Sequence, residues 1–173
     1  PEELAAALGL SPEAFPGAQE AGRRFRPRVP RSFVARMRPG DVNDPLLRQV
    51  LPVGAELADE IGYGADPVGE SEALRAPGLL QKYRGRALLI TTGTCAVNCR
   101  YCFRREFPYA QQSADAPRWS EALAEIAADA ALEEIILSGG DPLSLSNARL
   151  ESLTRALTAI PHVRRIRVHT RQP

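Results

Sequence analysis

The residues whose types and spacing point most directly to chemistry are the three cysteines. Cys95, Cys99 and Cys102 follow the spacing C-x3-C-x2-C. Thiolates are soft ligands that suit zinc or an iron–sulfur cluster. An odd and closely clustered set does not fit a disulfide framework, which would spread an even number of cysteines along the chain. We therefore expect a metal centre and a reducing, cytoplasmic compartment.

The identity of the metal depends on the fourth ligand. A closed structural zinc site needs four ligands, but the two histidines, His162 and His169, are distant from the cysteines in sequence. Three thiolates on a [4Fe–4S] cluster leave one iron without a protein ligand, and that iron is free to bind a small molecule. We favour the cluster; a zinc-binding module and three buried cysteines are the alternatives.

From residue 86 onward, apolar strands alternate with amphipathic helices. The pattern predicts strands over 86–92, 133–137 and 165–169, and helices over 120–131 and 147–160. This order predicts an α/β fold with a parallel sheet and right-handed crossovers. The turn Ser138-Gly139-Gly140-Asp141-Pro142 follows the second strand. Barrels of this class build their sites at the carboxyl ends of strands.

The first 85 residues have a different composition, with 10 of the 15 prolines and 10 of the 13 glycines. Proline blocks helix interiors, so only short helices are expected, over 2–8, 31–37 and 45–50. We predict a mostly helical, Pro/Gly-rich extension over 1–85, followed over 86–173 by the first βα units of a barrel. A complete eightfold barrel takes about 250 residues. The chain is therefore expected to be the N-terminal part of a longer protein.

The charge and the distribution of apolar residues limit the kinds of partner that the protein is expected to bind. The net charge is +1, which does not suggest a nucleic-acid binder. The sequence contains no apolar run long enough to cross a membrane, and its start does not resemble a secretory signal. The basic run Arg23–Arg28 is interpreted as a solvated surface, with contact to RNA or to an acidic partner as the alternative.

Two of these segments together resemble a known signature. The cysteine loop after a first strand, with Tyr101 before its last cysteine, is similar to that of the radical S-adenosylmethionine enzymes. The glycine-rich turn stands where that superfamily has its second motif. Segments 88–90, 95–105, 107–109 and 137–143 resemble the lysine 2,3-aminomutases, and segments 28–33, 43–50 and 77–80 resemble the branch that acts in β-lysylation of elongation factor P.

The resemblance implies a partial (β/α) barrel and an isomerase. Its substrate would be L-lysine, converted to β-lysine by a 1,2-amino shift for modification of elongation factor P. The implied cofactors are a [4Fe–4S] cluster, S-adenosylmethionine and pyridoxal 5′-phosphate. The alternative is another radical S-adenosylmethionine aminomutase, acting on lysine or glutamate.

The resemblance also implies roles for individual residues. Cys95, Cys99 and Cys102 match the cluster ligands, and Arg104 matches the arginine that grips the substrate carboxylate. Tyr83 and Arg86 match a tyrosine beside pyridoxal phosphate and an arginine on its phosphate. The remaining expected contacts are to S-adenosylmethionine, from Tyr101, Ser138, Gly139, Gly140, Asp141, His169 and Arg171, with Thr170 beside them.

Two departures from the family pattern stand out. Glu106 occupies a position where a histidine is expected. The family's pyridoxal lysine, and the carboxylates that hold the substrate's ε-amine, lie near the C-terminal end of the barrel. Lys82 is the only lysine in the chain and stands at the wrong place to form the imine. This chain by itself is therefore expected not to catalyse the shift.

Overall fold

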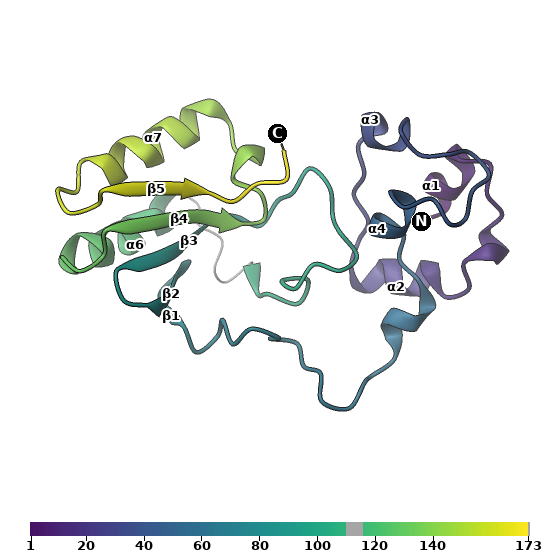
Figure 1. Ribbon diagram of the computed structural model, residues 1–173, viewed down its shortest axis with the longest axis horizontal. Coiled ribbons are helices and arrows are strands. Elements are labelled where there is room, and N and C mark those ends of the chain that lie inside the picture. The colour runs from purple at the N-terminus through teal and green to yellow at the C-terminus, as the bar shows by residue number, and fades with distance from the viewer. Residues whose placement is uncertain (110–115, 173) are drawn as a thin grey trace. The chain divides into compact units, whose positions relative to one another are not determined.

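The computed structural model describes residues 1–109 and 116–172 (Figure 1). The chain divides into two compact units. The first unit comprises Pro1–Pro67 together with Ala96–Glu106. The second comprises Val68–Cys95 and the described part of Phe107–Pro173. Most of the cysteine loop thus belongs to the unit built by the N-terminal segment.

Short helices build the first unit, as the frequent prolines predict. They are α1 (Glu2–Ala7), α2 (Ala18–Arg24), α3 (Arg31–Val34) and α4 (Leu47–Val50), with 3₁₀ turns η1 (Pro12–Ala14) and η2 (Gly54–Leu57). Their apolar residues form a small core that includes Leu8, Met37, Leu47, Val50 and Leu51. Val97 of the cysteine loop packs against that core. The loop is therefore part of the hydrophobic structure of this unit.

A buried carboxylate organises the start of α4. Asp44 is 2% exposed and accepts hydrogen bonds from the backbone N–H groups of Leu47, Arg38 and Leu46. These donors, the Leu47 N–H foremost, lower the pKa of Asp44, because they favour its charged form. The side chain of Asp44, the residue before Pro45 in the sequence, thereby holds the segment before α4 in place.

One five-stranded sheet forms the second unit, in the order β1-β2-β3-β4-β5. The strands are β1 (Leu74–Ala76), β2 (Leu79–Tyr83), β3 (Arg86–Thr92), β4 (Glu134–Gly139) and β5 (Arg165–Val168). The last three are parallel, and β1 and β2 add antiparallel to β3. Helix α6 (Ala116–Ala128) and helix α7 (Asn147–Thr158) connect the parallel strands, with the 3₁₀ turn η3 (Pro142–Ser144) before α7.

Both connecting helices pack on the same face of the sheet. Ala87, Leu89, Ile135 and Leu137 alternate along β3 and β4 toward that face, and they form one core with residues of α6 and α7. Helices on a single face are the arrangement of a barrel, in which they form the outer ring. The opposite face carries the alternate residues of the same strands, from Arg86 and Glu134 to Ile90 and Ser138.

The predicted α/β fold is confirmed, with three parallel strands and two connecting helices in the expected order. Strands β1 and β2 were not predicted. They lie within 1–85, which was expected to be a helical extension, and they pair with the sheet. The compact units consequently divide after Pro67 rather than after residue 85. No helix in the described part of the chain is long and apolar enough to span a membrane.

The face of the sheet opposite the helices yields a prediction about acid stability. Glu134 is 8% exposed and accepts a hydrogen bond of 2.8 Å from Arg165 Nη1, while Arg167 lies 3.1 Å away. The Arg165 hydrogen bond is the main cause that lowers the pKa of Glu134. A lowered folded-state pKa contributes stability that is present above the unfolded value of about 4.3 and is lost as pH falls through the folded value.

Glu134→Gln should therefore lower the melting temperature near neutral pH, and the gap to wild type should close as pH falls below about 4. Thermal melts from pH 7 to pH 3 measure this gap. Glu151→Gln is the control, because Glu151 is a 68% exposed partner of Arg155. A gap that stays constant with pH would contradict the assigned role of the Glu134 carboxylate.

Candidate cofactor site

Residues predicted for cofactor binding gather at the carboxyl edge of the parallel strands. Strand β3 leads into Cys95, β4 leads into the turn Gly139-Gly140-Asp141, and β5 leads into 169–171. Because β3, β4 and β5 are parallel, these three strand ends meet at one edge. The backbone N–H of His169 donates to Leu137 O at 2.9 Å, which continues the pairing past β5. The sequence prediction placed these segments at one edge, and the structure brings them together there.

The two glycines allow close contact between backbones at this edge. Gly140 N donates to Thr92 O at 2.7 Å, and Asp141 N donates to Thr94 O at 2.8 Å. A Cβ on Gly140 would lie 2.4 Å from Thr94 O. Gly139 has a φ of +111°, and a Cβ there would lie 2.6 Å from Thr92 O. The two glycines therefore let the turn after β4 bind the backbone of Thr92 and Thr94, and Thr94 is the residue before Cys95.

Asp141 holds the segment that follows β5. Asp141 is 4% exposed, and its carboxylate accepts hydrogen bonds from Thr170 Oγ1 at 2.7 Å, Arg171 N at 2.9 Å and Leu143 N at 3.0 Å. The carboxylate is therefore used to position residues 170–171 against the turn after β4. This positioning role went unforeseen, since the sequence indicated only a cofactor contact for Asp141. The cofactor contact itself stays a prediction.

Hydrogen bonds from the backbone of the cysteine loop and from the side chain of Asn98 fasten this loop of the first unit to the N-terminal segment. Asn98 N donates to Arg28 O at 2.9 Å, and Asn98 Nδ2 donates to Arg26 O at 2.8 Å. Arg100 N donates to Gln49 O at 2.8 Å. Residues between the cysteines, which the motif leaves open, therefore decide where the loop is held.

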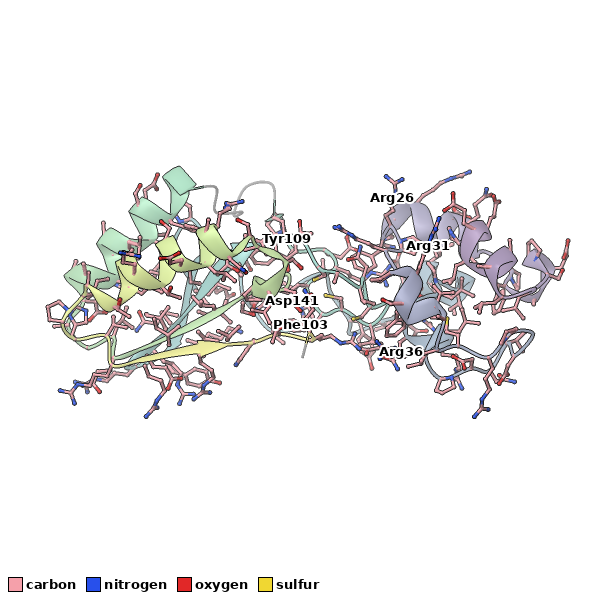
Figure 2. The ribbon with its side chains drawn as sticks, turned by 90° about the horizontal axis from the view of Figure 1, so that it is seen from above. Arg26, Arg31, Arg36, Phe103, Tyr109 and Asp141 are labelled. Carbon is pink, nitrogen blue, oxygen red and sulfur yellow. The ribbon has the colours of Figure 1, made fainter. Side chains whose placement is uncertain are left out.

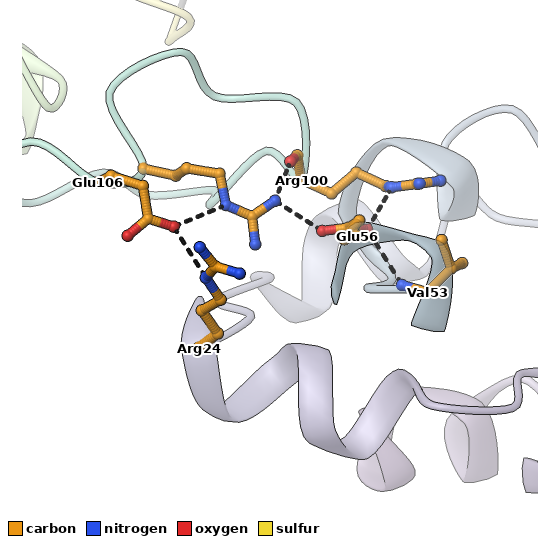
Figure 3. Close-up of polar contacts among 6 residues, drawn as sticks. Arg24, Val53, Glu56, Arg100 and Glu106 are labelled. Carbon is orange, nitrogen blue, oxygen red and sulfur yellow. Dashed lines mark hydrogen bonds and ion pairs between the residues drawn. The ribbon is translucent and has the colours of Figure 1, made fainter. Parts of the chain in front are cut away.

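Glu56 is the central anchor of this loop (Figure 3). Its side chain is 11% exposed. Oε1 accepts hydrogen bonds from Arg100 Nε at 2.8 Å and from Val53 N at 3.0 Å. Oε2 accepts one from Arg105 Nη1 at 2.7 Å, and the same nitrogen donates to Arg100 O at 3.1 Å. One carboxylate in η2 thus joins the two arginines that flank Cys102.

Glu106, the departure from the family pattern, joins the same network. Its carboxylate lies 3.3 Å from Arg24 Nε and 3.7 Å from Arg105 Nε, as Figure 3 shows. The Arg105 guanidinium also lies 5.1 Å from the centre of the Phe25 ring. Sequence reasoning missed Glu56 altogether. The only signal for Glu56 was its position in the first turn of a short helical segment, three residues after Val53.

The three thiols are chemically suited to a cluster. Cys95, Cys99 and Cys102 are thiols that form no disulfide; Cys99 is buried, and Cys95 and Cys102 are partly exposed. Cys95 belongs to the second unit, whereas Cys99 and Cys102 belong to the first. In residues 1–109 and 116–172, no three His, Cys, Asp or Glu side chains form a group that could hold a metal ion. The fit to a cluster therefore rests on the donor set and its spacing.

The other predicted residues are distributed more widely. Tyr101 is 62% exposed, and Arg104 is 6% exposed with its guanidinium 4.7 Å from the Phe103 ring centre. Tyr83 and Arg86 pair at the amino end of β3, with the guanidinium 5.2 Å from the tyrosine ring centre. The structure therefore places these two at the other end of β3, about 20 Å of strand away from the edge described above.

Comparison with known proteins agrees with this arrangement. Residues 89–173 match the Radical SAM superfamily. The chain therefore carries a Radical SAM domain, and that family implies a [4Fe–4S] cluster and S-adenosylmethionine.

Within that class the chain is a homologue of the L-lysine 2,3-aminomutases. It is 47% identical to the L-lysine 2,3-aminomutase of Escherichia coli (strain K12), over 100% of this chain and 51% of that protein. It is 42% identical to the enzyme of Haemophilus influenzae, with 100% and 51% covered. It is 33% identical to that of Clostridium subterminale, with 99% and 42% covered. The chain spans about half the length of the first of these curated relatives, and the predicted resemblance is confirmed.

The Glu56 anchor yields a prediction about cluster retention. Glu56→Gln keeps the shape of the side chain but removes the charge that Arg100 and Arg105 share, which should cost about 1–3 kcal/mol. We expect the loop to loosen and reconstituted protein to lose iron to a chelator several times faster than wild type. Glu151→Gln, in an exposed ion pair with Arg155, should lose iron at the wild-type rate. Equal rates for Glu56→Gln and wild type would contradict the anchoring role.

Proposed function

We propose that this chain forms part of an enzyme that converts L-lysine to β-lysine by a 1,2-amino shift. One observation carries the proposal: a C-x3-C-x2-C loop leaves the carboxyl end of β3 beside the Gly139–Asp141 turn, in a chain 47% identical over its full length to an L-lysine 2,3-aminomutase. The loop supplies the thiols, and the strand edge supplies the backbone groups for a small-molecule ligand.

Cys95, Cys99 and Cys102 would hold a [4Fe–4S] cluster. When bound, the cluster supplies the electron that cleaves S-adenosylmethionine. The chain's own contribution is placement. Gly140 and Asp141 fix the backbone at Thr94, one residue before Cys95, and Glu56 fixes the loop around Cys102. The edge residues Ser138, Gly139, Gly140, His169 and Arg171, together with Tyr101 of the loop, would contact S-adenosylmethionine.

Arg104 would bind the carboxylate of lysine. A guanidinium suits this role because its planar fork pairs with a carboxylate through two hydrogen bonds. Arg104 comes two residues after Cys102, so the substrate would be held close to the cluster loop. Its burial supports the role, since a carboxylate bound there would be shielded from water, which strengthens the ion pair.

Pyridoxal phosphate would lie toward the amino end of β3, against Tyr83 and Arg86. Both side chains are exposed, so they are accessible to a ligand. Arg86, Arg165 and Arg167 bring three positive charges near the single carboxylate of Glu134. That excess of positive charge favours a phosphate group. The lysine that forms the imine is expected in the part of the family's sequence that this chain does not cover.

The product would serve the modification of elongation factor P. The resemblance of segments 28–33, 43–50 and 77–80 to that branch of the family supports this assignment. Intact-mass measurement of elongation factor P in a deletion strain tests it. A factor lacking the mass of one β-lysine would support the pathway, and an unchanged factor would favour an aminomutase of secondary metabolism.

Anaerobic reconstitution tests the cofactor proposal. With iron and sulfide, the reduced protein should give a [4Fe–4S] electron paramagnetic resonance signal that changes when S-adenosylmethionine is added, because one iron has no protein ligand. Cys99→Ser should lose the signal, since it removes one of three ligands. Zinc bound without sulfide, in this chain and in a full-length form, would refute the cluster and support the zinc module.

Product analysis tests the reaction. A full-length form with the three cofactors and a reductant should convert L-lysine to β-lysine and leave L-glutamate unchanged, as mass spectrometry of derivatised amino acids would show. The 173-residue chain alone should form no β-lysine, because Lys82 is its only lysine and lies on β2 rather than near the end of a barrel. β-Lysine from this chain alone, or β-glutamate from the full-length form, would contradict the proposal.

A further inference from the structure

The cysteine loop leaves and re-enters the second unit at one place. The chain passes from the second unit to the first after Cys95 and returns to the second unit at Phe107. Tyr109, on the returning side, lies against Gly93, on the leaving side. A Cβ on Gly93 would lie 2.9 Å from Tyr109 Cβ and 3.0 Å from Tyr109 Cγ. We call this contact between Gly93 and Tyr109 the clasp; it joins the two ends of the loop within the second unit.

The clasp explains why residue 93 is a glycine. Gly93 is not among the glycines with a positive φ, so its backbone conformation is also open to alanine. The obstacle is steric, because the three atoms nearest to a Cβ at this position all belong to the side chain of Tyr109. The missing side chain thus allows the tyrosine to pack directly on the backbone that leads into Cys95.

Phe107 holds the ring of Tyr109 in this position. The two ring centres are 4.9 Å apart, with an angle of 63° between the ring planes, which is the edge-to-face arrangement that aromatic pairs favour. The backbone N–H of Tyr109 also donates to Phe107 O at 2.8 Å. Segment 107–109 is therefore a compact turn that presents the tyrosine ring to Gly93.

The clasp lies at the strand edge where cofactor contacts are predicted. Gly93 lies between Thr92 and Thr94, whose carbonyls accept hydrogen bonds from the turn after β4. Figure 2 shows the side chains of Tyr109 and Asp141 at the same end of the sheet. Two separate segments, this turn and the turn at 107–109, therefore hold the backbone just before the first cysteine.

Tyr109 has no comparable role in the core of the second unit. Within residues 1–109 and 116–172, the hydrophobic core shared by the sheet and its helices does not include Tyr109, which is half-buried. Loss of its ring should therefore act on the clasp and leave that core intact.

We propose that Tyr109 is a positioning residue that closes the base of the cysteine loop and thereby sets where Cys95 lies relative to the turn Gly139–Asp141. The inference rests on the proposed function, because it gives Tyr109 a role in placing one ligand of the [4Fe–4S] cluster. Bringing the ends of a flexible loop together costs conformational entropy. A contact that closes the loop beforehand removes part of this cost from cluster binding.

Amide hydrogen exchange of the cluster-free protein, followed residue by residue by NMR, tests the clasp without any cofactor. In Tyr109→Ala, the amides of Gly140 and Asp141, which bind the backbone on either side of Gly93, should exchange about tenfold faster than in wild type. Amides in the centre of β4 should keep their wild-type rates. Equally faster exchange throughout β4 would indicate a general loss of stability, and unchanged exchange at the turn would indicate no clasp; either result would overturn the proposal.

Two variants serve as controls. Tyr109→Phe keeps the carbon atoms that contact Gly93 and should exchange at the wild-type rate. Tyr63→Ala removes the same side chain from a position in the first unit that is 85% exposed, and it should also match wild type. Faster exchange in Tyr109→Phe would assign the effect to the hydroxyl group and overturn the packing role.

A double-mutant cycle tests whether Gly93 and Tyr109 act through each other. In reconstituted protein, Gly93→Ala should displace the ring and speed the loss of iron to a chelator about as much as Tyr109→Ala does. The two changes together should speed iron loss no more than the larger single effect, because the effects of residues in contact are not additive. Effects that multiply would show that the two residues act independently, which contradicts the clasp.

The response to S-adenosylmethionine tests the position of the cluster rather than its retention. Immediately after reconstitution, the concentration that produces half of the change in the electron paramagnetic resonance signal should be about threefold or more higher for Tyr109→Ala than for Tyr109→Phe, because a misplaced cluster weakens a geometry-dependent contact. Equal concentrations would overturn the positioning role. If wild type forms no cluster, the proposed function fails, whereas amide exchange still decides whether Tyr109 closes the base of the loop.

Discussion

The carboxylate of Glu56 is the interaction on which the arrangement of the cysteine loop depends. It is held at Val53 by its own 3₁₀ turn and binds Arg100 on one side of Cys102 and Arg105 on the other. Removing this carboxylate would leave Arg100 and Arg105 without the counter-ion that they share, and a guanidinium of low exposure is costly to leave uncompensated. The N-terminal segment, although irregular, is thus a structural support for the loop that carries Cys99 and Cys102, which follow Glu56 by 43 and 46 residues.

The sheet edge is organised by a different constraint, the close approach of backbones. Gly139 and Gly140 allow the ends of β3 and β4 to come within hydrogen-bonding distance, where any Cβ would collide with Thr92 or Thr94. Asp141 then ties the segment after β5 to the same turn. Gly139, Gly140 and Asp141 therefore each have a structural role within this chain. That role is compatible with a ligand contact at the same edge.

The periodic spacing of apolar residues predicted the strands and helices whose formation depends on local sequence. The spacing of apolar residues was enough to predict the strands over 86–92, 133–137 and 165–169 and the helices between them. Because these strands are parallel, their carboxyl ends lie at the same edge of the sheet. Strands β1 and β2 could not be found this way. They are short, and only Leu79 and Leu80 of their residues are deeply buried. Their strand conformation comes from pairing with β3, a tertiary influence that local propensity does not contain.

At the candidate site too, the spacing of the cysteines predicts some features and not others. Cysteine spacing selects the chemistry, because three soft ligands in a short loop suit few metals. The residues between and after the cysteines determine which parts of the chain hold the loop, because Asn98, Arg100 and Arg105 bind groups from distant segments. Glu106 illustrates the point. A histidine there could not supply the permanent negative charge that Arg24 and Arg105 share, so the acidic residue and the basic segment that faces it are best understood as one paired feature of this chain.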